Sequence, residues 1–311
     1  MIEQNRWGII YCPKSGLLSS SKRRWEKIQE CLQKENILYD HVQSESRGSV
    51  DRLVRMFIDN GYHTIVVIGG DSALNDAVNC LMQVDQNVRE KVALGVIPNG
   101  MMNDFAHFWY LDEDDYAMTI KALKRHRVKK IDLGLMRYVN QEGERCKRYF
   151  LNCVNVGFIA TIMNLRRRTR HFFGSRGLSF FFSFILLLFQ RLDYKMKLKI
   201  NTDQIDRRVM TICVGNALGY GQTPNAVPYN GQLDVSVVYH SGLRQIAAGI
   251  YFFLRGELLN IHNVHPYRTR LVRVEKAEGA LIGLDGRLMR TPVGPFTISV
   301  VPESINFLIP S

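Results

Sequence analysis

The first 130 residues alternate between short apolar runs and stretches in which apolar residues recur at helical spacing. The run Thr64–Ile68 is β-branched throughout, which is typical of a strand buried on both faces of a parallel sheet. Further strands are predicted at Trp7–Tyr11, Leu38–Val42 and Val92–Ile97, and helical patterns begin near Ser20, Val50, Ala73 and Asn103. These repeated strand–loop–helix units predict a doubly wound parallel α/β domain.

From residue 131 onward, short strand patterns are separated by Gly, Asn, Asp and Pro turns, and they predict an antiparallel β-sandwich. The predicted strands are Ile131–Met136, Tyr149–Val156, Lys195–Ile200, Arg207–Val214, Leu233–Tyr239, Thr269–Val274, Ala280–Leu284 and Phe296–Val301. Helical patterns interrupt them at about 177–192 and 243–259. We therefore expect an α/β domain over 1–130 and a β-sandwich domain over 131–311, with room for the C-terminal segment to return to the first domain.

Composition narrows the class of protein. The chain has 311 residues, of which 46% are hydrophobic and 23% charged, so disordered, collagen-like and coiled-coil classes are excluded. The six cysteines form no C-x-x-C pair, which argues against a disulfide framework or a zinc cluster and favours a reducing cytosol. The N-terminus shows no apolar signal region, and the longest apolar run, Leu178–Phe189, is shorter than the ~20 residues of a membrane span. We expect a soluble intracellular protein.

The charge points to the kind of partner. Lys and Arg number 41 against 29 acidic residues, a formal net charge of +12. Such a surplus favours nucleic acid, nucleotide phosphate or an acidic membrane surface, although a basic protein can also use its charge only to stay in solution.

Two loops after buried strands have the composition of an anion site. Gly69-Gly70-Asp71 and Pro98-Asn99-Gly100 each follow a strand and precede a helix, so main-chain N–H groups at a helix start can face an anion. Loops on neighbouring strands face each other at the carboxyl edge of such a sheet, where α/β folds bind ligands. The alternative is a pair of ordinary turns, with Asn103 and Asp104 capping the next helix.

The motifs of both loops resemble those of the diacylglycerol kinase catalytic-domain family, which includes bacterial lipid kinases, sphingosine kinases and ceramide kinases. The family signature G-G-D-G-T-x-N-E resembles Gly69–Asp76, and its P-x-G-T-x-N-D-F-A resembles Pro98–Ala106. Further resembling segments follow in order: Cys12–Gly16 for N-P-x-S-G, Ile131–Gly134, Asn155–Phe158, Val214–Asn216, Asn230–Val235, Leu284–Arg287 and Asn306–Pro310. The resemblance covers essentially the whole chain.

The resemblance implies an NAD-kinase-like α/β domain followed by a β-sandwich that receives the lipid. It also implies transfer of the γ-phosphoryl group of ATP to a lipid hydroxyl with Mg²⁺, the acceptor being diacylglycerol or a sphingoid-type lipid. By the same resemblance, the nucleotide-binding residues are Ser44, Gly69, Gly70, Asp71, Ser72, Ala73, Leu74, Asn75, Gly100 and Asn103.

Several positions depart from the family pattern. Ser72, Ala73 and Met101 replace a Gly and two Thr of the loops, and a left-handed backbone at Ser72 would cost about 1 kcal/mol. Tyr229 and Asn230 replace an acidic pair that holds a structural Mg²⁺ in the family.

Arg287 stands where the family D-G-E supplies a carboxylate used as general base. A general base typically contributes about 10²–10⁴-fold to the rate, so its loss need not abolish activity. Asp285 and Asp71 are the remaining candidates for the catalytic acid–base role or for binding Mg²⁺. Arg287 is either a contact to phosphate or substrate, or an ordinary turn residue.

A basic segment suggests how the protein meets its substrate. Arg166–Arg170 and Arg176 flank aromatic residues and precede the apolar run Leu178–Phe189, as in interfacial segments that bind anionic headgroups. A buried helix after a solvated basic turn is the alternative. Nucleic acid is not expected, because no recognition motif accompanies the arginines. We expect a cytoplasmic protein held peripherally at the inner face of the membrane.

Three functions remain open at this point. The first is an ATP-dependent lipid kinase. The second is a catalytically degenerate relative that binds nucleotide or anionic lipid without turnover, which the altered loop positions would favour. The third is an NAD-kinase-like enzyme, against which the segment Asn230–Val235 and the loop Pro98–Ala106 argue.

Overall fold

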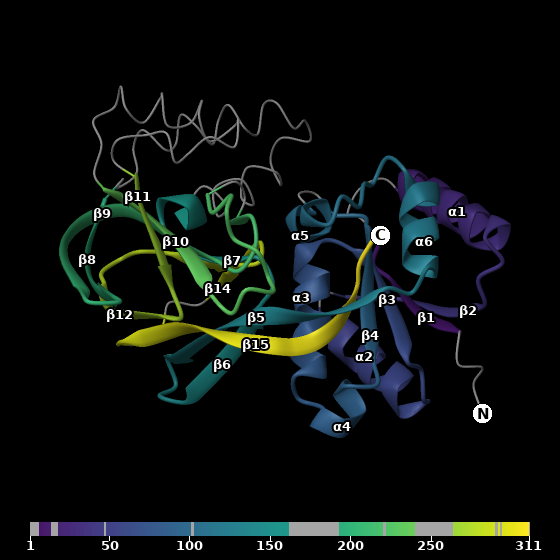
Figure 1. Ribbon diagram of the computed structural model, residues 1–311, viewed down its shortest axis with the longest axis horizontal. Coiled ribbons are helices and arrows are strands. Elements are labelled where there is room, and N and C mark those ends of the chain that lie inside the picture. The colour runs from purple at the N-terminus through teal and green to yellow at the C-terminus, as the bar shows by residue number, and fades with distance from the viewer. Residues whose placement is uncertain are drawn as a thin grey trace. The chain divides into compact units, whose positions relative to one another are not determined.

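The computed structural model describes residues 6–13, 18–46, 48–100, 103–161, 193–219, 222–239, 264–289, 292 and 294–310 (Figure 1). The chain divides into two compact units. The first unit comprises Met1–Leu133 and Pro302–Ser311, and the second comprises Gly134–Val301. The C-terminal ten residues thus group with the first unit.

The first unit is an α/β domain. Its strands are β1 (Trp7–Tyr11), β2 (Tyr39–Gln43), β3 (Thr64–Gly69) and β4 (Ala93–Pro98), and its helices are α1 (Leu18–Lys34), α2 (Val50–Asp59), α3 (Asp71–Leu81), α4 (Gln86–Arg89), α5 (Asp104–Phe108) and α6 (Tyr116–Lys124). The sheet order is β2–β1–β3–β4 followed by the end of β15 (Phe296–Leu308), and all these neighbours are parallel. Because the strands are parallel, their carboxyl ends and the loops that follow lie along one edge.

Both faces of this sheet are covered. Every residue of β1, β3 and β4 is buried, as expected for parallel strands between helices. Helix α2 packs against α3 and α1 packs against α6. The side chain of Phe57 on α2 occupies the space beside Gly8, and Phe105 on α5 packs edge-on against Phe307 of β15. The predicted doubly wound domain is confirmed.

The second unit is an antiparallel β-sandwich, which confirms the other half of the predicted fold class. Its strands are β6 (Arg145–Phe150), β7 (Cys153–Gly157), β8 (Tyr194–Ile200), β9 (Asp203–Gly215), β10 (Leu233–Tyr239), β11 (Val264–Thr269), β12 (Leu271–Ala277), β13 (Ile282–Leu284) and β14 (Arg287–Met289), with β5 (Val128–Val139) and β15 shared with the first unit. The ladder runs β14–β13–β7–β9–β8–β12–β15, β10 joins β9 to β11, and β5 pairs with β6 and β15.

Strand β8 shows why the sandwich forms. Its residues alternate between buried and exposed, so that Met196 and Leu198 enter the core while the three lysines Lys195, Lys197 and Lys199 face outward. Strand β9 is long enough to pair with β8 along its first half and with β7 along its second half. Valines, isoleucines and leucines from these strands form one continuous core.

Two predicted strands are each divided in the structure, and both breaks have a local cause. The predicted strand Tyr149–Val156 separates into β6 and β7, because the N–H groups of Leu151 and Asn152 donate to the carboxylate of Asp285. The predicted strand Thr269–Val274 is the junction of β11 and β12, where the Thr269 hydroxyl accepts the N–H of Leu271. Neither break contains glycine or proline, so neither has a turn signal in the sequence.

The structure also holds elements that the hydrophobic pattern missed, among them α6 and the short strand β14, which pairs with the predicted strand β13. The predicted helices at 177–192 and 243–259 lie outside the described residues. Within the described part of the chain, no helix is long and apolar enough to cross a membrane.

Candidate functional site

The two glycine loops of the first unit meet at the carboxyl edge of its sheet. Gly69 and Pro98 are partners across β3 and β4, so the loops leave the sheet side by side. A Cβ on Gly70 would lie 2.8 Å from the Cα of Gly100, and a Cβ on Gly100 would overlap the backbone of Gly70. Gly70 has an extended backbone that any residue can adopt, with φ −105° and ψ −177°. These glycines are therefore required by close backbone contact rather than by a left-handed conformation.

Asp71 links one loop to the helix that follows the other. It is the first residue of α3, and its carboxylate accepts the N–H groups of Asp104 (3.2 Å) and Phe105 (3.1 Å) at the start of α5. Burial raises the pKa of the Asp71 carboxyl above its ordinary value, and the two N–H donors oppose that shift. The residue as a whole is partly exposed at this edge of the sheet.

Asn103 holds the second loop closed. Its Oδ1 accepts the N–H of Gly100 at 2.7 Å, its Nδ2 donates to Glu113 at 2.8 Å, and its backbone is left-handed with φ 55°. Asparagine tolerates that conformation better than most residues. The sequence suggested that Asn103 caps α5, but its side chain makes no cap hydrogen bond, and Asp71 supplies the cap instead.

The ends of β1 and β2 complete this edge of the sheet. Ser44 is buried, and its hydroxyl donates to the carbonyl of Ser46 and accepts from Ser49. Burial raises the pKa of the Cys12 thiol, at the end of β1, to about 11. The Asn99 amide donates to the Cys12 carbonyl at 3.1 Å. These bonds and those of Asp71 cross-link the loops after β1, β3 and β4, while Ser44 and Ser49 hold the loop after β2 together.

Arg24 brings a positive charge to the same edge. It lies on α1, and its guanidinium donates to Oδ1 of Asn99 at 3.4 Å. Sequence reasoning missed this residue, because Arg23 and Arg24 sit in an ordinary amphipathic helix and 75 residues separate Arg24 from Asn99. Only the tertiary fold brings Arg24 to the loops.

The remaining predicted loop residues lie in the first turns of α3. Ser72 is exposed and Ala73 half-buried, whereas Leu74 and Asn75 are buried. Ser72 is part of the helix and its φ is not positive, so a serine at this position costs no left-handed backbone strain. The Asn75 side chain and carbonyl both accept from Asn79 within the helix. Of these four residues, Ser72 and Ala73 are the ones whose side chains reach the surface.

Asp285 lies in the second unit and is saturated by main-chain donors. Its Oδ2 accepts the N–H of Leu151 at 2.7 Å, and its Oδ1 accepts those of Asn152 and Cys153, each at 3.0 Å. The residue is 1% exposed and has a left-handed backbone with φ 41°. This geometry gives Asp285 a structural role in holding the bend between β6 and β7. Its predicted catalytic role stays a prediction. Arg287 begins β14 and is half-buried.

The residues that replace the family's acidic pair do not fit a metal. Tyr229 is 43% exposed, and Asn230 uses its side-chain oxygen to accept the N–H of Gln232. Neither offers the carboxylate oxygens that Mg²⁺ prefers, so we derive no step through a structural Mg²⁺ there.

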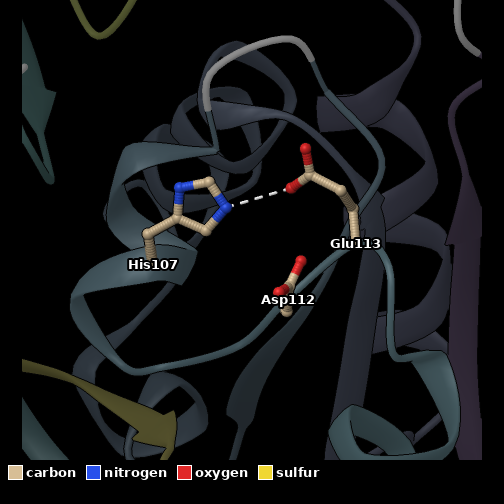
Figure 2. A group of neighbouring side chains, drawn as sticks. All are labelled: His107, Asp112 and Glu113. Carbon is tan, nitrogen blue, oxygen red and sulfur yellow. Dashed lines mark hydrogen bonds and ion pairs between the residues drawn. The ribbon is translucent and has the colours of Figure 1, made fainter. Parts of the chain in front are cut away.

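A different group of side chains has the chemistry of a cation site. His107, Asp112 and Glu113 place one ligand atom each within 4.8 Å of one another, and Figure 2 shows the imidazole turned toward Glu113. The His107 Nε2 and the Glu113 carboxylate are 3.0 Å apart. Glu113 also accepts from Asn103, so this group is joined to the second glycine loop.

Several predicted features lie outside the described residues: Lys14–Gly16 of the first motif, Met101 of the second loop, and the basic and apolar segment 166–189.

Comparison with known proteins agrees with this architecture. Residues 6–136 match the diacylglycerol kinase catalytic domain, and residues 152–309 match the YegS C-terminal NAD kinase beta sandwich-like domain. The chain is 21% identical to a diacylglycerol kinase of Staphylococcus carnosus over 91% of this chain and 89% of that one. It is 33% identical to a probable lipid kinase YegS-like of Chromohalobacter salexigens, over 38% of this chain and 34% of that one.

Solved structures show the same fold. The crystal structure of a diacylglycerol kinase from Bacillus anthracis aligns over 98% of this chain and 97% of that one, with a TM-score of 0.66 and 17% identity. Yeast NADH kinase complexed with NADH aligns over 98% of this chain and 83% of that one, with a TM-score of 0.52 and 8% identity. With both parts of the chain matched in order, the protein belongs to the diacylglycerol kinase family of lipid kinases.

Proposed function

We propose that this protein binds ATP at the two glycine loops and transfers its γ-phosphoryl group to a lipid hydroxyl of the diacylglycerol or sphingoid type. The observation that carries the proposal is the backbone contact of Gly70 with Gly100 beside the start of α3. Side chains are excluded there, so a phosphate chain can approach the main chain closely. The N-terminus of an α-helix also favours a negative charge.

The surrounding groups suit a triphosphate. Arg24 on α1 adds a guanidinium, which binds phosphate through a planar pair of donors. The exposed Ser72 hydroxyl adds a neutral partner that is new relative to the family pattern. The contact of Ser44 with nucleotide stays a prediction, because its hydroxyl already donates to the Ser46 carbonyl. Phosphoryl transfer depends mainly on positioning and on neutralising charge, which this set can supply.

We assign the proton acceptor, or the protein ligand of Mg²⁺, to Asp71. Asp71 accepts two N–H groups and is a partly exposed residue, whereas Asp285 accepts three and is 1% exposed. A raised pKa also suits an acid–base group. Bound Mg²⁺ would supply charge neutralisation, and it takes most of its oxygen ligands from phosphates and water.

Membrane association is the second part of the proposal. A lipid substrate requires the protein to reach a bilayer, and the arginines of 166–176 are the basic cluster that the sequence offers for that contact. Sedimentation with phosphatidylglycerol vesicles, weaker at high salt and absent with phosphatidylcholine vesicles, is the expected result. Equal sedimentation with both vesicles would contradict it.

Transfer of radiolabel from [γ-³²P]ATP to a panel of lipid alcohols in mixed micelles tests the function. Labelled lipid phosphate is expected, with loss of labelling in Gly70→Val and retention in Gly48→Ala, because a Cβ on Gly48 meets nothing within 4 Å. If the wild type binds nucleotide without labelling any lipid, while Ser72→Gly, Met101→Thr and Arg287→Glu together restore labelling, the protein is a catalytically degenerate relative and the proposal fails.

A further inference from the structure

A groove in the second unit gathers three arginines around an apolar floor. Its volume is about 460 Å³, within the ~300–1,000 Å³ typical of small-molecule sites. Arg137 of β5, Arg145 of β6 and Arg273 of β12 line it. The apolar lining comes from Val139, Val274, Pro295 and Phe296. The groove lies wholly within 134–301, so none of the proposed nucleotide-binding residues forms it.

The positive charge of the groove is not balanced by its own walls. Glu275 is the one acidic residue among the described residues that line it, and its carboxylate is 2.9 Å from Nζ of Lys197. Among the residues that the structure describes, Arg137 donates only to the neutral hydroxyl of Ser299, at 3.4 Å. Over the described ranges, Arg145 and Arg273 form no ion pair.

Strand pairing places further positive charge beside the groove. Arg273 lies directly opposite Lys199 of β8, and Arg137 lies directly opposite Lys147 of β6. Like charges in such cross-strand positions destabilise a sheet. Two of them flank one groove, which indicates that the positions serve binding of an anion rather than stability of the sheet.

We propose that this groove binds a phosphate monoester attached to an apolar chain, that is, a lipid phosphate. The arginine forks match phosphate oxygens in pairs, and the floor of Val274 and Phe296 takes the first part of the chain. A lipid phosphate is also the product class of the reaction proposed above, but binding in this groove needs no turnover. The ligand reaches the groove either as a free monomer or from a membrane.

Calorimetry on the full chain without nucleotide tests the proposal. The probes are monomeric dihexanoyl phosphatidic acid, vesicles of phosphatidylcholine with phosphatidic acid, and dihexanoyl phosphatidylcholine as the zwitterionic control. We expect the wild type to bind phosphatidic acid. Arg273→Gln should weaken the affinity about tenfold, because the loss of one charged hydrogen bond costs about that much. The double variant Arg145→Gln, Arg273→Gln should bind more weakly still. Binding to the monomer indicates a free ligand, and binding to the vesicles alone indicates a membrane source. Either result supports the proposed site if the arginine variants bind more weakly.

Arg270→Gln is the matched control, because Arg270 is exposed, carries the same charge and does not line the groove. It should bind as the wild type does. Arg273→Gln should also leave the melting temperature unchanged or raise it, because it removes the repulsion with Lys199. Equal affinity of wild type and the double variant, or equal binding of phosphatidylcholine, would overturn the proposal. Since no nucleotide is present, that failure is separate from any failure of phosphoryl transfer.

Discussion

Asp71 in the first unit and Asp285 in the second are the two carboxylates that the sequence offers for chemistry, and the structure gives them different surroundings. Both accept main-chain N–H groups from another loop. Asp285 accepts three and is 1% exposed, whereas Asp71 accepts two and is half-buried at the edge of the sheet. A carboxylate saturated by buried donors stabilises a fold. One that accepts fewer N–H groups keeps acceptor capacity with which it can also bind a ligand.

The largest effect is expected on stability, from Asp285→Ala. Three main-chain N–H groups would lose their acceptor inside the protein, at a cost of roughly 3–5 kcal/mol in the free energy of unfolding. Asp285→Asn keeps the shape and suits the left-handed backbone, so it isolates the loss of charge. Urea denaturation measures both, with the exposed Asp206→Ala as control. A loss of stability below about 1 kcal/mol for Asp285→Ala would contradict the structural role assigned to Asp285.

Asp71→Asn should act on activity instead. We expect a fall in turnover on the order of 10²-fold or more, with nucleotide affinity nearly intact, because a proton acceptor or metal ligand is lost. Stability should change by about 1 kcal/mol or less, since the amide oxygen can still accept an N–H of α5. The measurement is lipid phosphorylation beside thermal unfolding, with exposed Asp59→Asn as control. Undiminished turnover would remove Asp71 from the mechanism.

A smaller effect is expected on the pH dependence of stability. Burial raises the pKa of Asp71 in the folded protein. The carboxyl group therefore contributes most to stability at a pH below its ordinary pKa, and this contribution is lost as the pH rises through the raised pKa. Asp71→Asn cannot ionise there. Its stability relative to wild type should therefore grow as pH rises from about 4 toward neutrality. Parallel stability curves for the two proteins would contradict the raised pKa.

The smallest expected effect concerns Cys12, at the same sheet edge as Asp71. Its pKa of about 11 leaves about one thiol in a thousand ionised at pH 8. Alkylation by iodoacetamide, followed by peptide mass spectrometry, should be slow at pH 8 and accelerate steeply up to pH 11. Rapid alkylation of Cys12 at pH 7 would show that the edge is more open than the structure has it.

The sequence predicted the parallel sheet and its paired loops, because β-branched runs and glycine breaks are local signals. The meeting of Gly70 and Gly100 then follows from topology, since parallel neighbours end at one edge. The role of Asp285 could not be predicted in this way, because its donors at Leu151 and Asn152 lie 134 and 133 residues away. The same limit applies to Arg24, which reaches Asn99 across 75 residues.

Binding of ATP to the first unit is the central claim, and titration calorimetry of the full chain with ATP and Mg²⁺ tests it most directly. The wild type and Gly48→Ala should bind with the same affinity. Gly70→Val should lose binding, because its Cβ would lie 2.8 Å from the Cα of Gly100 and its methyl groups would fill the space of the phosphates. No heat of binding for the wild type at millimolar nucleotide, or unchanged affinity in Gly70→Val, would contradict the claim.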